Sequence, residues 1–288
     1  MKTIIYLIIT IVIYLTLTSA TQKTAEANKI VILQTTDSKA TSQLLMQSAK
    51  IISERLKNYG LKSVDVNVIA DKGQIKIQLP DNLLISEIEG LLTSNGKLAF
   101  YESLTLKEIA DLLKNKNNLS HLNNDPKTSP SDARIGCATF EDHSMVDTVE
   151  NYLKSINLFK NHKLFWGLKN DKSMTCLYAL KTDDAGKALL LRSDIETIKS
   201  SIDKDSQAFN IEIKFKPTSS KIWATATKNN FGKPIAIVID DKVFYTPVVK
   251  TTIENGLCEI SGNLSQKEAD YFLALVNNDP LPLDFILK

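Results

Sequence analysis

Histidine is the side chain that most often acts as a general base or metal ligand near neutral pH, and this sequence holds few of them. The three histidines, His121, His143 and His162, are far apart, and no serine or cysteine near them forms a recognisable nucleophile motif. Histidines in such surroundings are usually solvated. We therefore expect no catalytic histidine.

Paired carboxylates occur at Glu141-Asp142, Asp183-Asp184 and Asp240-Asp241. General acid–base catalysis needs one carboxylate of a pair to be desolvated in a cleft. The surroundings favour local roles instead: a helix cap for the first pair, the start of a helix for the second and an exposed turn for the third. Replacing Asp240 and Asp241 by Asn is therefore expected to cost little stability.

The three cysteines are Cys137, Cys176 and Cys258. Their odd number is not that of a disulfide framework, and their spacing is not that of a zinc site. They can be buried small apolar residues, or one pair can oxidise outside the cytoplasm, so pairing of Cys137 with Cys176 stays open. Gly186-Lys187 lacks the other glycines of a phosphate loop. We expect no cofactor and no metal.

Composition narrows the classes of partner. The 288 residues include 35 basic and 33 acidic side chains, which gives a net charge of +2. Such a balance creates no long-range field for nucleic acid or for an anionic membrane. The length allows one or two domains with a sizeable core.

The N-terminus has the features of an export signal. Lys2 precedes an apolar run at 4–17, and Thr18-Ser19-Ala20 supplies small residues suited to cleavage after Ala20. The run is shorter than the about 20 residues that a spanning helix needs, but its composition also allows an uncleaved anchor. We expect an exported chain that meets the membrane only through residues 1–20.

Regular alternation and helical spacing predict six elements in residues 27–103, in the order βαββαβ, which is that of a ferredoxin-like unit. The strands are expected at 30–33, 64–68, 75–77 and 97–101, and the helices at 40–58 and 83–92.

Residues 104–202 are predicted to form a second α+β unit. A helix is expected at 105–115, and 115–133 is a polar linker that contains Pro126 and Pro130. Strands at 134–139, 163–168 and 174–180 and a helix at 144–156 follow. Phe165, Trp166 and Trp223 are expected in the core, although Trp166 could contact a partner.

Residues 229–264 organise the last part of the chain. Ile235, Ile237 and Ile239 alternate with Ala236 and Val238, as in a strand with two distinct faces. Leu257–Ile260 is a further short strand with a turn at Gly262-Asn263, and Ser265 with Glu268 forms the capping box of a helix. We expect Trp223, Phe272 and Val276 to pack over the three isoleucines.

The same stretch carries a resemblance. Gly232-Lys233-Pro234 leading into IAIVIDDKVFYTPVV, followed by Ile260-Ser261-Gly262-Asn263 before a capped helix, resembles the end of the large periplasmic (P1) domain of SecD. IISERLKNYG, GQIKIQLP and KLAFYES resemble the first periplasmic segment of SecD, and KLFWGLKN with CLYALK resembles the head subdomain of SecDF fusion proteins. Asp241 and Ser219 depart from this pattern, since the family usually has Gly at both positions.

The resemblance implies an exported, non-enzymatic domain that assists Sec-dependent translocation by binding translocating polypeptide or Sec translocase components in the periplasm. It also implies a ferredoxin-like base in two pieces, 27–103 and 203–288, with the α+β head inserted at 104–202. The proton-conducting membrane helices of the family have no counterpart in the sequence beyond its N-terminal segment. The alternatives are an envelope structural or binding protein that keeps the fold, and, less favoured, an envelope hydrolase.

The polar linker predicts where a protease cuts first. Few buried side chains hold the backbone of 115–133, so limited trypsin or subtilisin digestion should cleave there before anywhere else. Mass spectrometry of the first fragments measures this. A first cut inside 229–264 would show that the core has been assigned to the wrong segment.

Overall fold

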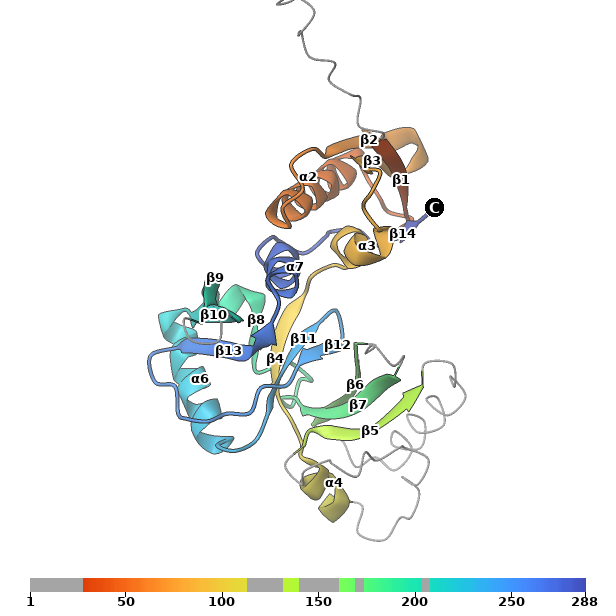
Figure 1. Ribbon diagram of the computed structural model, residues 1–288. Coiled ribbons are helices and arrows are strands. Elements are labelled where there is room, and N and C mark those ends of the chain that lie inside the picture. Colours follow the sequence, from red (N-terminus) through yellow and green to blue (C-terminus); the bar gives the residue numbers. More distant parts are fainter. Residues whose placement is uncertain (1–27, 113–131, 140–160, 169–173, 204–207) are drawn as a thin grey trace, which may run out of the picture.

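The computed structural model describes residues 28–112, 132–139, 161–168, 174–203 and 208–288. The predicted N-terminal signal or anchor, most of the linker at 115–133 and the helix at 144–156 lie outside these residues. The described chain is a mixed α+β structure with three sheets, which confirms the predicted class (Figure 1). Its sheets have four, three and seven strands.

The four-stranded sheet, here sheet A, has the order β14-β1-β3-β2 and is antiparallel throughout. Its strands are β1 (Asn28–Thr35), β2 (Asp65–Ile69), β3 (Gln74–Pro80) and β14 (Phe285–Leu287). The helices α2 (Ser42–Asn58) and α3 (Ile85–Thr93) pack against it. Leu33, Ile75, Ile77 and Leu79 are fully buried beneath them together with Ile52 and Leu56.

One strand of the predicted ferredoxin-like unit is elsewhere. The strand expected at 97–101 is β4 (Leu98–Glu102), and it does not join sheet A; β14, from the other end of the described chain, pairs with β1 in its place. The physical reason is that β4 is apolar on both faces, so it fits a position covered on both sides. At the edge of sheet A one of those faces would be exposed.

Strand β4 instead belongs to the seven-stranded sheet B, with the order β5-β7-β6-β12-β11-β4-β8. The other strands are β5 (Arg134–Thr139), β6 (His162–Gly167), β7 (Met174–Lys181), β8 (Leu190–Leu191), β11 (Ile235–Ile239) and β12 (Lys242–Tyr245). Ser103, just after β4, forms a bridge with Leu180 of β7, so the sheet curls back on itself. Sheet B thus contains strands from all three predicted pieces, and the boundaries between 103 and 104 and between 202 and 203 stay a prediction.

The central strands of sheet B are shared by two cores. Ile235, Ile237 and Ile239 face the main core, in which Trp223, Phe272 and Val276 are also buried, as predicted. The intervening Ala236 and Val238 face a second, smaller core that includes Tyr101 and Phe165, whose rings are 5.2 Å apart. The alternation in the sequence therefore separates two interiors, and neither face of β11 meets solvent.

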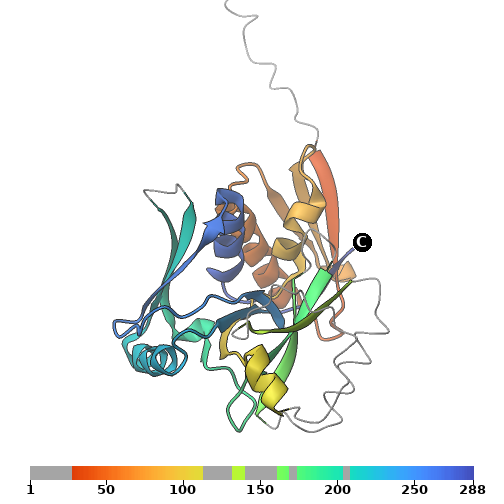
Figure 2. The same cartoon turned by 60° about the horizontal axis from the view of Figure 1, so that its bottom comes forward.

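Sheet C has the order β13-β10-β9 and lies on the opposite side of the molecule from β5, β6 and β7 (Figures 1 and 2). It consists of β9 (Ile195–Ile202), β10 (Phe209–Phe215) and β13 (Leu257–Leu264), and α7 (Gln266–Val276) and α6 (Pro217–Asn229) pack against β10. The capping box of Ser265 and Glu268 at the start of α7 is confirmed. The turn predicted at Gly262-Asn263 is wrong, because both residues continue β13 and the pairing with β10 shifts register there. Gly262 and Asn263 therefore belong to a β-bulge within the strand instead of a turn that ends it.

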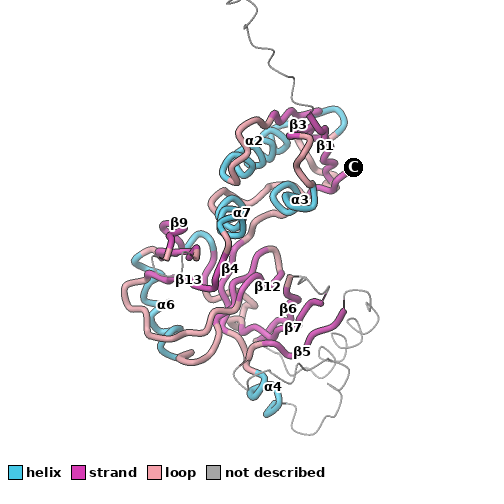
Figure 3. Tube along the Cα trace, in the orientation of Figure 1, coloured by secondary structure: helices cyan, strands magenta, loops and turns pink. Residues whose placement is uncertain are grey.

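Helix α7 connects the two halves of the molecule. It packs on α2 and α3 of sheet A and on the strands of sheet C (Figure 3). The other connection is the loop 94–97, which leads from α3 into β4 between Arg55 and Asp240. Arg55 is fully buried, and its guanidinium donates to the carbonyl oxygens of Ser94 at 2.6 Å and Asn95 at 2.7 Å. Burial lowers the pKa of Arg55 to about 10, although the negative charge of Asp240 opposes this shift.

Asp240 holds the same loop from the other side. Its carboxylate accepts hydrogen bonds from the backbone N–H of Gly96 at 2.9 Å, from that of Lys97 at 2.8 Å and from the Ser94 hydroxyl. The expectation that Asp240 only shapes an exposed turn is therefore wrong, whereas Asp241 is exposed as expected. Gly96 has φ of +82° and leaves no room for a side chain, since a Cβ there would lie 2.5 Å from an Arg55 nitrogen.

These contacts predict different costs for two neighbouring substitutions. Asp240→Asn replaces one acceptor oxygen by an N–H₂ group that faces other donors, and should lower the free energy of unfolding by roughly 1–3 kcal/mol. Asp241→Asn, at an exposed position with the same backbone conformation, should change it by less than about 0.5 kcal/mol. Urea unfolding of both variants measures this. Equal losses in the two would contradict the role given to Asp240.

Candidate functional site

The candidate site is an open hollow of about 370 Å³ between α6, the end of β4 and the segment before β8. Its lining combines apolar side chains with charges of both signs at the edge. The lining residues are Glu102, Leu189, Lys221, Ile222, Thr225 and Ala226.

Helix α6 supplies most of this lining because its two faces differ. Pro217 stands in the first turn, where its missing N–H costs no helical hydrogen bond. Trp223 and Ala226 turn inward to the main core, while Ile222 turns outward and is 45% exposed. A branched apolar side chain that stays this open beside the hollow is a possible contact for an apolar side chain of a partner.

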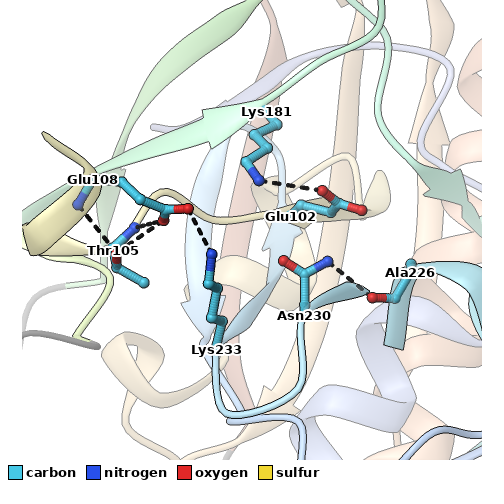
Figure 4. A network of polar contacts seen from close by, with 7 residues as sticks. All are labelled: Glu102, Thr105, Glu108, Lys181, Ala226, Asn230 and Lys233. Carbon is cyan, nitrogen blue, oxygen red and sulfur yellow. Dashed lines mark hydrogen bonds and ion pairs between the residues drawn. The ribbon is translucent and has the colours of Figure 1, made fainter. Parts of the chain in front are cut away.

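Glu102 closes the hollow on the side of sheet B. It is the last residue of β4, and its carboxylate lies 3.5 Å from the ammonium of Lys181 on β7 (Figure 4). Both side chains are partly exposed, with relative exposures of 32% for Lys181 and 23% for Glu102. The ion pair connects β4 to β7 close to the point where Ser103 bridges Leu180. The charge at this edge of the hollow is therefore already neutralised within the chain.

A second ion pair fixes the start of α4 (Leu106–Leu112) next to Glu102. Thr105 and Glu108 form a capping box: the Thr105 N–H and hydroxyl both donate to the Glu108 carboxylate at 2.8 Å. The other oxygen of Glu108 lies 2.6 Å from the ammonium of Lys233 (Figure 4). Glu108 thus joins α4 to the segment between α6 and β11.

Asn230 places Lys233. The Asn230 side chain is buried and donates to the carbonyl oxygen of Ala226 at 2.9 Å, while its backbone N–H caps the end of α6. Gly232 then takes φ of +75°, and the Lys233 N–H donates back to the Asn230 carbonyl. This tight turn directs the Lys233 side chain to Glu108.

The protonation states around the site follow from these contacts. Burial raises the pKa of Glu108, but hydrogen bonds from Lys233 and Thr105 outweigh it and lower the pKa to about 2. Burial and the nearby Lys181 lower the pKa of His162, so this imidazole is neutral at pH 7. The Glu108–Lys233 pair is therefore intact near neutral pH. Around the hollow, the residues that the structure describes bring together fixed charges and an apolar wall, which suits binding.

The residues considered for catalysis from the sequence are not gathered at this hollow. His121, His143, Glu141 and Asp142 lie outside the described residues. The helix predicted from Asp183-Asp184 is wrong: the Asp183 carboxylate accepts from the N–H groups of Ala185 and Lys187 at 2.9 and 2.7 Å and closes a turn before β8. Asp184 accepts from the Asn161 side chain at 2.9 Å. A side chain that bonds its own backbone competes with helix formation.

The cysteines resolve into two kinds. Cys137 on β5 and Cys176 on β7 stand directly opposite each other and form a disulfide, so of the two alternatives for this pair oxidation is the correct one. Cys258 is free and buried in the main core, and burial raises the pKa of its thiol to about 12. It is a structural residue.

Sequence reasoning missed Glu102, Glu108, Lys181 and Lys233. The sequence did contain a signal for the local contact of Glu108 with Thr105, because Thr105-Leu106-Lys107-Glu108 has the spacing of a capping box. Nothing in the sequence indicated the partners Lys233 and Lys181. Lys233 is 125 residues from Glu108, and Lys181 is 79 residues from Glu102.

The chain was compared with known proteins. Residues 173–283 match the family model described as SecDF, P1 head subdomain. The protein translocase subunit SecD of Petrotoga mobilis is 24% identical over 248 residues, which cover 85% of this chain and 46% of that protein. SecD of Calditerrivibrio nitroreducens is 32% identical over 46% of this chain and 26% of its own length.

The chain is similar to the P1 domain of the SecD and SecDF proteins. A crystal structure of SecDF in a super-membrane-facing form has a similar fold, with a TM-score of 0.52 and 17% identity over 91% of this chain and 29% of that one. The SecD-like chain spans about half the length of the Petrotoga relative and about a quarter of the Calditerrivibrio one. Of its described helices, none combines the length and hydrophobicity needed to cross a membrane.

The Glu108–Lys233 pair predicts how stability depends on acid. The pKa of Glu108 is lower in the folded chain than its ordinary value of 4.5, so the pair contributes fully above about pH 5 and is lost as pH falls toward 2. Lys233→Met removes the main donor and lets burial raise that pKa. This variant should be less stable at pH 7 and should lose less stability between pH 5 and pH 2.5.

Urea unfolding across this pH range measures both effects. Lys50→Met is the matched control, because Lys50 pairs with Glu54 at 3.9 Å on the surface of α2 and keeps a 78% exposed side chain. Its acid dependence should stay close to that of the unaltered chain. A Lys233→Met variant with an unchanged slope would contradict the assigned pairing.

Proposed function

We propose that this chain acts in the cell envelope as an exported SecD-like domain that assists Sec-dependent protein translocation. In this proposal it binds translocating polypeptide or components of the Sec translocase and catalyses no reaction. The observation that carries it is the match of residues 173–283 to the SecDF P1 head subdomain, together with the similarity to SecD along most of the chain.

The proposal also covers the finer architecture. Sheet A with α2 and α3 is taken as the ferredoxin-like base, with β14 in the place predicted for 97–101. The α+β unit at 104–202, which contains β5, β6 and β7, is taken as the head, and it shares residues 173–202 with the segment that matches the head-subdomain model. The return of β14 to β1 supports a base assembled from both ends of the chain, because the two strands pair over three residues.

The hollow beside α6 is the proposed contact for polypeptide. Its apolar wall of Leu189, Ile222 and Ala226 fits an apolar side chain of an extended segment, and the edge charge of Glu102 is already paired with Lys181. A contact of this kind places little demand on sequence, which suits a partner that binds many different exported chains. The same chemistry contributes nothing to bond cleavage.

Photo-crosslinking in cells tests this function. A benzoylphenylalanine at Ile222 should capture Sec translocase subunits or exported polypeptides, identified by mass spectrometry. The matched control is Lys228, which is exposed on the same helix outside the hollow. We expect at least fivefold more crosslinked product from Ile222 than from Lys228.

The alternatives have distinct outcomes. Crosslinks from Ile222 to envelope proteins unrelated to translocation would favour a structural or binding role without translocation. Equal crosslinking at the two positions, with no Sec component among the products, would overturn the proposed function. Export is tested separately, since full-length protein free in the cytoplasm would contradict an exported domain.

A further inference from the structure

Strand β9 is an unusually complete open edge. It has eight residues and pairs with β10 along its length, and no strand of the described residues pairs with its other side. The edge strands β8, β14, β2 and β5 are shorter, with two, three, five and six residues. The other edge of sheet C, β13, also has eight residues, but its pairing with β10 is interrupted between Ile260 and Leu264. An edge strand of this length presents a row of unpaired backbone donors and acceptors that another extended chain can use.

The hydrogen bonds show which backbone groups of β9 face outward. The Asp203 N–H donates to the Ala208 carbonyl at 2.9 Å, so that pair faces inward across the hairpin. Because orientation alternates along an antiparallel pair, Ile202, Ser200 and Ile198 point away from β10. The Asn277 side chain, which donates to the Ile198 carbonyl at 3.3 Å, agrees with this assignment. That carbonyl is thus already used, so the outward groups offered to a partner are those of Ser200 and Ile202.

On one face of this edge, two isoleucines flank Ser200. Ile198 is opposite Ile213 in the register, and both are buried in the main core. The last row of the sheet consists of Ile202, Phe209 and Leu264. Ile202 is 55% exposed at the open end of this row, while Phe209 and Leu264 pack against the core. The apolar face therefore continues to the edge and is uncovered there.

The other face of sheet C is polar. Lys199 is opposite Glu212 on β10, and their charged groups are 3.0 Å apart. Thr197 is exposed on the same face. A lysine on an edge strand also disfavours pairing between two copies of the same chain. The edge thus offers a partner of different sequence one face with Ile198 and Ile202 and a polar face with Thr197 and Lys199.

We propose that β9 binds an extended segment of another polypeptide, which adds to sheet C as a fourth, antiparallel strand. The inference rests on the proposed function and specifies where and how the polypeptide is held. The segment alternates apolar and polar residues, with an apolar side chain beside Ile202 and a polar side chain beside Lys199, whose charge Glu212 already balances. The antiparallel direction continues the pairing of both existing neighbours in the sheet.

The geometry fixes which residues of the segment make the backbone contacts. In an antiparallel pair, residues directly opposite one another place their side chains on the same face. The segment residues opposite Ser200 and Ile202 are therefore the apolar ones, and their N–H groups point at β9. The N–H groups of the polar residues point to solvent.

N-methylated peptides test this assignment. The probe is a fluorescein-labelled nine-residue peptide that alternates Val or Ile with Ser, Thr or Glu, and binding to the full chain is measured by fluorescence anisotropy. N-methylation of two apolar residues should weaken binding at least tenfold. The same modification on two polar residues should change it less than threefold.

Substitutions on β9 provide the complementary test. Ser200→Pro removes an outward N–H that the sheet does not use, so it should weaken peptide binding at least tenfold and leave the melting temperature within a few degrees. Ser200→Ala keeps the N–H and should bind within threefold of the unaltered chain. If Ser200→Pro fails to fold, the two N-methylated peptides still decide the question.

Three results would overturn the inference: equal binding of both N-methylated peptides, loss of binding on methylating the polar set, or a dimer of the chain in sedimentation that Ser200→Pro abolishes. The last would assign the edge to a second copy. None of these depends on the crosslinks from Ile222. If the peptide experiments contradict binding at β9, the proposed function is still supported or contradicted by the crosslinking alone. If the crosslinking fails, the peptide measurements can still be interpreted.

Discussion

The whole arrangement depends on one buried cation. Arg55 lies on α2 without any exposed surface, and its nearest charge of opposite sign, Asp240, acts across the loop 94–97. Leaving a guanidinium in a low-dielectric interior is costly unless its donors are met. Here the carbonyl groups of α3 and the following loop accept from the two terminal nitrogens, while the buried Nε has no partner. The position of sheet A relative to sheet B therefore depends on hydrogen bonding of this loop as well as on apolar packing.

The second organising feature is that β4 and β11 have no solvent face. Each contributes alternate side chains to the main core and to the smaller core around Tyr101 and Phe165. Changes in one core can reach the other through these strands, since the same backbone forms a wall of both. The hollow and the two ion pairs beside it lie at the end of β4, where this shared wall meets α6.

Local patterns were enough to predict most elements, because alternation in Ile235–Ile239 and the capping box at Ser265 are written in adjacent residues. Local patterns were not enough to predict which strands pair with one another. The apolar run Leu98–Tyr101 indicates a strand that is covered on both faces. The strand that takes the expected place of this run in sheet A is β14, and its three residues are too few to be recognised as a strand from the sequence. Asp240 shows the same limit: its position suggests a turn, and its role comes from backbone groups about 144 residues away in the sequence.

The disulfide between Cys137 and Cys176 has a consequence for the unfolded chain. It closes a covalent ring with a sequence separation of 39 residues, so the denatured chain loses conformational freedom even when every strand has melted. A ring of that size corresponds to about 4 kcal/mol of loop-closure entropy in the chain-entropy model. In an oxidising compartment the disulfide therefore favours the pairing of β5 with β7, and a reduced chain would search many more arrangements before finding it.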